Sequence, residues 1–172
     1  LVECPLLKED EHYKMDIELF ENKILTENVK VFILCSPHNP VGRVWTKKEL
    51  QAVLDICKKY GVYVIADEIH QDIIMSGYEK VTAATCGNYD EYLITLTSAS
   101  KSFNIAGFQC AYAIIPNDKM REDYDRLAKK LHFTEGNSFS YIATQAVYEH
   151  GRPWLESVCN IVESNYYYLK NE

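Results

Sequence analysis

The sequence predicts an α/β domain with a mainly parallel central sheet flanked by helices. Apolar segments that suit strands alternate along the chain with segments that suit helices. The apolar segments are nearly continuous, which is the pattern of strands buried on both faces of a parallel sheet. The 172 residues fit one domain with a sizeable core.

The first strand and its two flanking helices lie within the first 61 residues of the chain. Residues 14–27 are predicted to be helical, because Asp16 can cap the first turn and apolar residues recur at spacings of three and four. Residues 29–35, with the sequence VKVFILC, form the first buried strand. A second helix begins at the capping box of residues 46–49 and ends at Gly61.

Three more strands and three helices are predicted after Gly61. The strands are short apolar runs, at residues 62–66, 92–97 and 110–115. The helices follow them, at residues 118–131, 140–150 and 153–169. Because the last two helices succeed each other without a strand, the sheet is expected to end near residue 115.

The composition argues against nucleic-acid binding and membrane insertion. A formal net charge of −7 does not provide the basic footprint that nucleic-acid binding needs. No apolar run approaches the roughly 20 residues that span a bilayer. The six cysteines are scattered without a Cys-x-x-Cys pair, a pattern that fits a reducing cytoplasm. The chain begins with neither Met nor a signal peptide, so we expect part of a longer cytoplasmic protein.

Three polar clusters follow three of the predicted strands. Each comes directly after its strand: residues 36–42 (SPHNPVG), 67–70 (DEIH) and 98–104 (SASKSFN). Ligands of such sheets bind at the loops that leave the carboxyl ends of the strands. The three clusters therefore indicate a functional site at one rim of the sheet.

The side chains in these clusters suit a pyridine-based cofactor. The amine of Lys101 can form a Schiff base with an aldehyde. The carboxylate of Asp67 can keep a pyridine nitrogen protonated, so that the ring accepts electrons from a substrate carbanion. Asn39 can donate a hydrogen bond to a phenolate oxygen, and Ser98 can contact a phosphate.

The strings SPHNPVGRVW, VIADEIH and SASKSFNIAGF resemble motifs of the class I/II aminotransferase family of pyridoxal-phosphate enzymes, fold type I. They are most similar to its cystathionine β-lyase, or C–S lyase, branch. Each string is weak alone, but the three occur in the family's order, with similar gaps and matching strand context. The resemblance spans nearly the whole chain. It implies the PLP-dependent transferase-like large domain, which is incomplete in this chain.

The resemblance implies a role for five residues. Lys101 would be the catalytic residue, which carries pyridoxal 5'-phosphate and moves protons. Asp67 would pair with the pyridine nitrogen, and Asn39 would lie against the phenolate oxygen. His70 stands where many relatives have a tyrosine that helps to bind that oxygen, and Ser98 would contact the phosphate.

The implied function is that of a C–S β-lyase, which cleaves sulfur amino acids to pyruvate, ammonia and a thiol. Many transaminases have a phosphate-binding arginine eight residues after the lysine, where this chain has Gln109. This departure favours the lyase over the alternative, an aminotransferase that transfers an amino group to a keto acid. An alternative of another class is a non-catalytic PLP-binding sensor domain of a transcription regulator.

The resemblance also implies partners and missing parts. Residues 1–150 would be part of the large, PLP-binding domain, and residues 151–172 would be a helix that leads toward a small C-terminal domain. The expected partner is a small amino-acid substrate, with no nucleic acid, membrane or metal, and the full-length protein is expected to be a homodimer. A piece that lacks the other site residues is expected to have weak or no activity.

Simpler explanations exist for each cluster alone. Lys101 could be an exposed loop lysine, and residues 39–42 could be a turn set by Pro and Gly. The string DEIH also occurs as the ATP box of DExH helicases, but the sequence contains no Gly-Lys-Ser/Thr phosphate loop. Asp67, Glu68 and His70 could be metal ligands, but no spaced His/Cys set completes such a site. We interpret Glu68 as structural and leave it out of the site.

Overall fold

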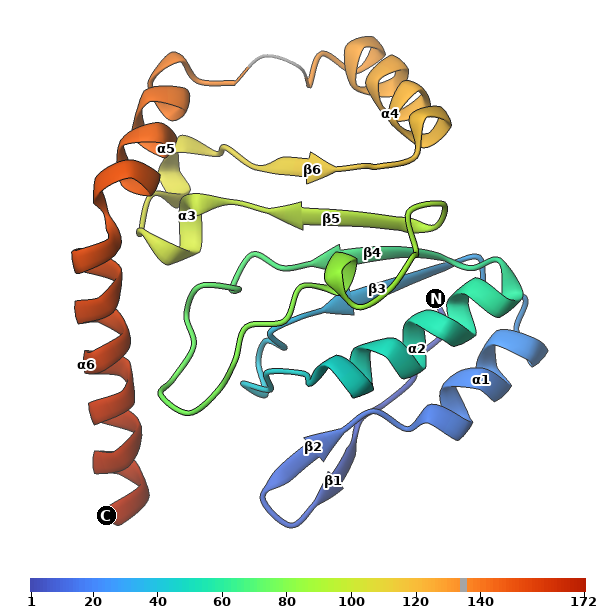
Figure 1. Ribbon diagram of the computed structural model, residues 1–172, viewed down its shortest axis with the longest axis horizontal. Coiled ribbons are helices and arrows are strands. Elements are labelled where there is room, and N and C mark those ends of the chain that lie inside the picture. Colours follow the sequence, from blue (N-terminus) through green and yellow to red (C-terminus); the bar gives the residue numbers. More distant parts are fainter. Residues whose placement is uncertain (134–135) are drawn as a thin grey trace.

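The computed structural model describes residues 1–133 and 136–172, and a four-stranded sheet lies at its centre (Figure 1). The strands are β3 (Val31–Cys35), β4 (Tyr63–Asp67), β5 (Leu93–Thr97) and β6 (Tyr112–Ile114). They lie in that order in the sheet. Strands β3, β4 and β5 are parallel, whereas β6 pairs with β5 in the antiparallel direction. The prediction of a mainly parallel sheet is confirmed.

The described chain also contains six α-helices. They are α1 (Ile17–Thr26), α2 (Lys47–Tyr60), α3 (Ala99–Ser102), α4 (Asp118–Lys130), α5 (Ser138–His150) and α6 (Arg152–Asn171). Five of these helices begin and end within three residues of a predicted helix. Helix α3 was not predicted. None of the described helices is both long enough and apolar enough to cross a bilayer.

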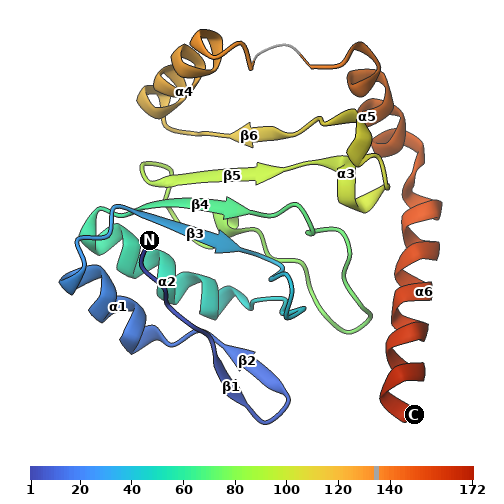
Figure 2. The same ribbon diagram turned by 180° about the vertical axis from the view of Figure 1, so that it is seen from behind.

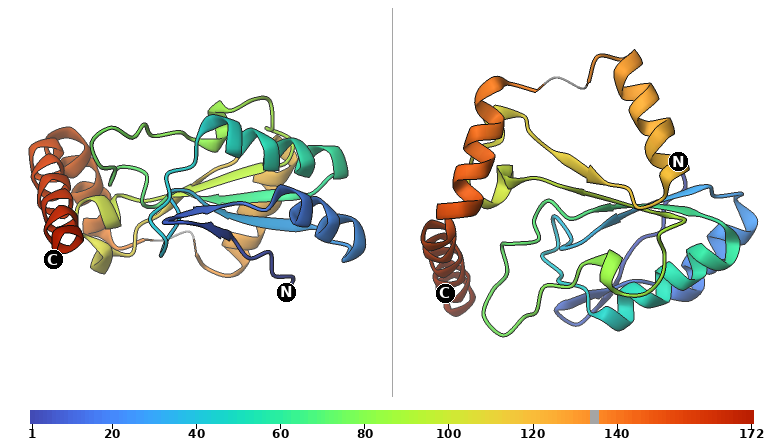
Figure 3. Two further views of the ribbon diagram at one scale, coloured as in Figure 1. Left: turned by 90° about the horizontal axis from the view of Figure 1, so that it is seen from below. Right: turned by 45° about the horizontal axis from the view of Figure 1, so that its top comes forward.

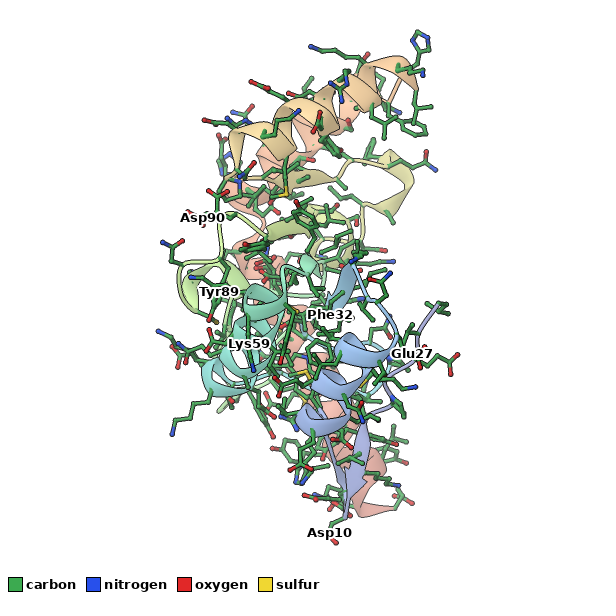
Figure 4. The ribbon with its side chains drawn as sticks, turned by 90° about the vertical axis from the view of Figure 1, so that its right-hand side faces the viewer. Asp10, Glu27, Phe32, Lys59, Tyr89 and Asp90 are labelled. Carbon is green, nitrogen blue, oxygen red and sulfur yellow. The ribbon has the colours of Figure 1, made fainter. Side chains whose placement is uncertain are left out.

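The core lies between the sheet and the paired helices α1 and α2, which cover one face (Figure 1). The side chain of Asp16 caps α1 by accepting a hydrogen bond from the backbone N–H of Leu19 at 2.9 Å. Phe20 of α1 packs edge-on against Phe32 of β3, with ring centroids 4.7 Å apart (Phe32 is labelled in Figure 4). The predicted apolar face of α1 is therefore confirmed.

Helix α2 has the ends that the sequence predicts. The backbone N–H of Thr46 donates to a Glu49 carboxylate oxygen at 2.8 Å, and the Glu49 N–H donates back to the Thr46 hydroxyl at 3.3 Å. Gly61 ends the helix in the left-handed conformation, with a φ of 67°. Between these ends, Leu50 and Val53 are fully buried against the sheet.

A short hairpin near the N-terminus was not predicted. It consists of β1 (Leu7–Glu9) and β2 (His12–Lys14), which pair in the antiparallel direction. Each strand has three residues, and Leu7, which begins β1 and pairs with Lys14, is exposed. Strands this short and this exposed leave no apolar alternation in the sequence. Lys14, the predicted first residue of a helix, instead ends β2.

The sheet face opposite α1 and α2 is open, which corrects the expectation of strands buried on both faces. In β3, Leu34 is buried toward the helices, whereas its neighbour Ile33 is 68% exposed. Tyr63 of β4 and Leu96 of β5 are exposed on that same face, and Ile114 of the edge strand β6 is also exposed. Figure 2 shows the sheet from this side. The apolar runs predicted the strands correctly but not their exposure, because α1 and α2 cover only one face.

The carboxyl ends of β3, β4 and β5 point toward α3, α5 and α6 (Figures 1 and 3). Helix α3 packs against α5, and α5 packs against α6. Pro153 stands in the first turn of α6, as predicted. No strand separates α5 from α6 in the described chain, whose last strand is β6. The fold therefore directs three parallel strand ends to one side of the molecule.

Candidate active site

The three polar clusters leave the sheet from adjacent, aligned strand ends. Cys35, the last residue of β3, pairs with Asp67, and Asp67 pairs with Leu96 of β5. The ladder continues one step further, because the Ser36 N–H donates to the Asp67 carbonyl at 3.0 Å and the Glu68 N–H donates to the Leu96 carbonyl at 2.9 Å. The predicted convergence of the three loop-bearing strand ends is thus confirmed, with β4 in the middle.

Asp67 is the last residue of this middle strand. Its side chain is half-buried, and its Oδ1 accepts a hydrogen bond from the backbone N–H of Ile69 at 3.1 Å. No described residue donates a hydrogen bond to Oδ2. Asp67 therefore combines a fixed carboxylate with an acceptor oxygen that remains available to a ligand.

Lys101 lies on α3, the one-turn helix that starts directly after β5. We call residues 98–102 the Lys101 turn. The Lys101 side chain is exposed, whereas its neighbours Ala99 and Ser102 are buried. Helical periodicity cannot predict a helix of four residues, so the sequence indicated only a loop here. The turn therefore holds the backbone of Lys101 between buried neighbours while the residue itself is exposed.

Ser98 caps the Lys101 turn. Its hydroxyl accepts a hydrogen bond from the Ser100 N–H at 3.0 Å and donates to the Cys110 carbonyl. The residue is only 2% exposed. The Ser98 hydroxyl therefore donates its one proton to the backbone. Contact between Ser98 and a phosphate stays a prediction.

Asn39 lies at the exposed tip of the loop that follows β3. Its backbone N–H donates to the sulfur of Cys35 at 3.3 Å. The loop is closed by hydrogen bonds from the His38 N–H to the Arg43 carbonyl at 2.7 Å and from the Gly42 N–H to the His38 carbonyl at 2.8 Å. Gly42 has a φ of 72°, so this segment is a turn in which Gly adopts the left-handed conformation. The role of Asn39 toward a cofactor stays a prediction.

Two histidines stand in the polar clusters. His38 packs edge-on against Trp45, with ring centroids 5.9 Å apart, and burial lowers the pKa of its imidazole. His70 is half-buried three residues after Asp67, and its carbonyl accepts a hydrogen bond from the Ile73 N–H at 3.0 Å. His70 thus lies in the loop beyond the middle strand, and its role toward a cofactor stays a prediction.

Glu68 is buried on the other side of the strand end from the site. It is 1% exposed, and its carboxylate accepts a hydrogen bond from the Ala83 N–H at 2.8 Å. Burial raises the pKa of this carboxyl group above its ordinary value of 4.5. The contact fixes the far end of the loop that follows β4, in keeping with a structural role for Glu68.

The raised pKa of Glu68 predicts how its contribution to stability depends on pH. A group whose pKa is raised in the folded state contributes stability that is present below its ordinary pKa and is lost as pH rises through the folded value. We compare the wild type with Glu68→Gln, because Gln stays neutral and can still accept from Ala83. The free energy of unfolding of the wild type, relative to Glu68→Gln, is expected to fall as pH rises from about 4 to 7. Urea unfolding at several pH values measures this difference, and a difference that is constant or rises with pH would refute it.

Two residues that no sequence pattern singled out also connect the clusters. Gln71 and Asp72 follow the DEIH string and form side-chain hydrogen bonds with Thr97 of β5 and Ser102 of α3. Their only sequence signal is that they are polar and directly follow a site cluster. Their partners lie more than 25 positions away, so sequence spacing could not identify them.

Two cavities lie beside the rim, and neither is lined by the five predicted site residues. A cavity of about 520 Å³ lies between residues 72–78, Phe103 and the helices α5 and α6. A second, of about 140 Å³, lies beneath β3 and includes Cys35 and His38. Among the described residues, no cluster of three or more His, Cys, Asp or Glu side chains is placed to hold a metal ion. The candidate site is the rim formed by the strand ends.

Comparison with known proteins identifies relatives of the whole chain. The family model for aminotransferase class I and II matches residues 1–171. Cystathionine β-lyase PatB of Bacillus subtilis is 35% identical over 162 residues, which cover 94% of this chain and 42% of PatB. This chain thus spans less than half the length of that curated relative.

Solved structures agree with this assignment. The PLP-bound C–S lyase of Staphylococcus hominis superposes with a TM-score of 0.92 at 38% identity, over 99% of this chain and 42% of that one. A PLP-bound putative aminotransferase of Clostridium difficile 630 superposes with a TM-score of 0.90 at 44% identity, over 94% and 42% of the two chains. The described fold is therefore shared with both a lyase and a putative aminotransferase.

Proposed function

Because this chain belongs to the class I and II aminotransferase family, we propose that it forms part of a pyridoxal-phosphate-dependent C–S β-lyase acting on sulfur amino acids. The proposal is carried by the register of three parallel strands, which directs the segments bearing Asn39, Asp67 and Lys101 to one rim. Two of its relatives, PatB and the enzyme of Staphylococcus hominis, are named as lyases, which supports the C–S lyase branch of the family.

The residues at the rim fit pyridoxal 5'-phosphate. A protonated pyridine nitrogen needs an acceptor, and Asp67 Oδ2 has no donor among the described residues. An aldehyde needs an accessible amine, and Lys101 is exposed. When bound, the cofactor supplies an electrophilic aldehyde and a ring that withdraws electrons from the substrate. The donor set at the rim therefore matches the functional groups of the cofactor.

Each residue has a separate task in this proposal. Lys101 holds the cofactor through its Nζ and, once displaced by the substrate amine, accepts the α-proton at that same atom. The Asp67 carboxylate holds a proton on the ring nitrogen. Asn39 donates its side-chain amide to the phenolate oxygen, His70 supports that oxygen, and Ser98 contacts the phosphate.

A transaminase would use these residues in the same way during the first half of its reaction. Gln109, at the position of the phosphate-binding arginine of many transaminases, favours the lyase. The similarity to a putative aminotransferase keeps amino transfer as the second candidate. A sensor domain of a transcription regulator would bind the cofactor and release no product.

Pyruvate release distinguishes these functions. The full-length protein is incubated with pyridoxal 5'-phosphate and cystathionine or cysteine, without any keto acid. The lyase is expected to release pyruvate and ammonia in equal amounts over many turnovers, because the carbon–sulfur bond is cleaved. If pyruvate is absent and an amino group is transferred to an added keto acid, the protein is a transaminase. If neither product forms while the cofactor binds, a sensor function is supported instead.

The cellular location, the oligomeric state and the domain assignment belong to the same proposal. We infer a cytoplasmic location from the six cysteines, which are all free in the structure. The family resemblance supports a homodimer for the full-length protein and a small amino-acid substrate. It also supports the assignment of residues 1–150 to the large domain and of residues 151–172 to the helix that leads out of it.

A further inference from the structure

The segment that follows Asp67 also reaches the Lys101 turn. Gln71 donates a hydrogen bond from its side-chain amide to the hydroxyl of Thr97 at 2.8 Å. Asp72, the next residue, accepts a hydrogen bond from the hydroxyl of Ser102 at 2.8 Å. Two consecutive side chains therefore contact the residue just before the Lys101 turn and the last residue of the turn.

Both partners on the Lys101 side are buried. Thr97 is 4% exposed and Ser102 is 0% exposed, whereas Lys101 itself is exposed. A helix of four residues is unstable by itself, because too few hydrogen bonds offset the cost of ordering it. The position of α3 therefore depends on contacts with the rest of the molecule, and these two hydrogen bonds hold it at both ends.

Asp72 is itself held in place. Lys80 donates to its other carboxylate oxygen at 3.2 Å, and the Cys159 thiol of α6 contacts its carbonyl at 3.8 Å. The Ser102 hydroxyl thus donates to a charged and anchored acceptor, which makes the stronger class of hydrogen bond. Asp72 lies only five residues after Asp67, so one short segment fixes both the carboxylate and the lysine of the rim.

We propose that Gln71 and Asp72 are positioning residues, which hold the Lys101 turn in register with Asp67 through Thr97 and Ser102. The inference rests on the proposed function, because it assigns these contacts the task of directing the Lys101 amine toward the cofactor. Their effect on the cofactor passes through Lys101, since neither side chain belongs to the predicted contact set.

The test measures where pyridoxal 5'-phosphate attaches. The full-length protein is treated with the cofactor and borohydride, and peptide mapping gives the labelling rate of Lys101 relative to the exposed Lys48 and Lys130. Ser102→Ala is expected to lower this ratio by about tenfold, because a small misplacement of a reacting group slows its reaction strongly. Ser102→Thr keeps the hydroxyl and should restore most of the ratio.

Further variants separate positioning from general destabilisation. Ser157→Ala is the matched control, since it removes a serine hydroxyl that bonds to the Pro153 carbonyl on α6, away from the turn. It should leave the ratio unchanged. Asp72→Ala should lower the ratio as Ser102→Ala does. The double variant should lower it no further than Asp72→Ala alone, because both substitutions remove the same Ser102–Asp72 hydrogen bond.

The outcomes distinguish failure of this inference from failure of the proposed function. If the wild type labels Lys101 no faster than Lys48, the proposed function itself is wrong. If the wild type prefers Lys101 and Ser102→Ala keeps that preference, only the positioning role is overturned. Additive effects of the Ser102 and Asp72 substitutions, or an equal slowing at all three lysines, would also overturn it.

Discussion

Replacing Lys101 with alanine is expected to lower kcat of the full-length protein by about 1,000-fold or more. One amine provides both the covalent attachment of the cofactor and the group that accepts the α-proton, so its removal affects two steps. The side chain is exposed and has no ion pair among the described residues. The free energy of unfolding of the apoprotein should therefore change by no more than about 0.5 kcal/mol.

The matched control for this prediction is Lys48→Ala, another exposed lysine in the first turn of a helix. It should retain the wild-type kcat. Steady-state kinetics and urea unfolding of both variants give the comparison. If Lys101→Ala retained more than a tenth of the wild-type kcat, another amine would have to do the chemistry.

The second large effect is expected for Asp67→Asn, with a decrease in kcat of about 100-fold. The Asn side chain has the same shape and keeps an oxygen that can accept from the Ile69 N–H, so the strand end should remain intact. It carries no charge, and it therefore cannot hold a proton on the pyridine nitrogen. The variant should still attach the cofactor at Lys101, because attachment does not use the ring nitrogen.

Asp90→Asn is the control for the loss of a carboxylate charge. Asp90, which is labelled in Figure 4, is exposed in the turn before β5. The Lys101 turn follows the other end of that strand. Its substitution should leave kcat unchanged. An Asp67→Asn variant with wild-type kcat would mean that this carboxylate does not control the ring, even if Lys101 carries the cofactor.

Local sequence patterns were sufficient to predict most elements of the fold. The Asp16 cap, the Thr46–Glu49 capping box and the ending at Gly61 each depend on residues within four positions, and all were confirmed. The three loops of the site could be predicted because parallel strands align their carboxyl ends. For the helix ends the physical determinant lies within a short stretch of sequence, and for the loops it is the shared direction of the strands.

Features that depend on distant contacts could not be predicted. The exposure of Ile33 depends on which face the helices cover, and an apolar run does not contain that information. The Lys101 turn is ordered by tertiary contacts from Gln71 and Asp72, and Ser98 is occupied by the carbonyl of Cys110. These contacts join residues that are 12 to 30 positions apart, with no motif to mark them.

The most direct test of the central claim is to identify the lysine that binds the cofactor. The full-length protein is loaded with pyridoxal 5'-phosphate, reduced with borohydride and digested, and the modified peptide is sequenced. We expect one stoichiometric label, on Lys101. A stoichiometric label on any other lysine, or no label at all, would contradict the account.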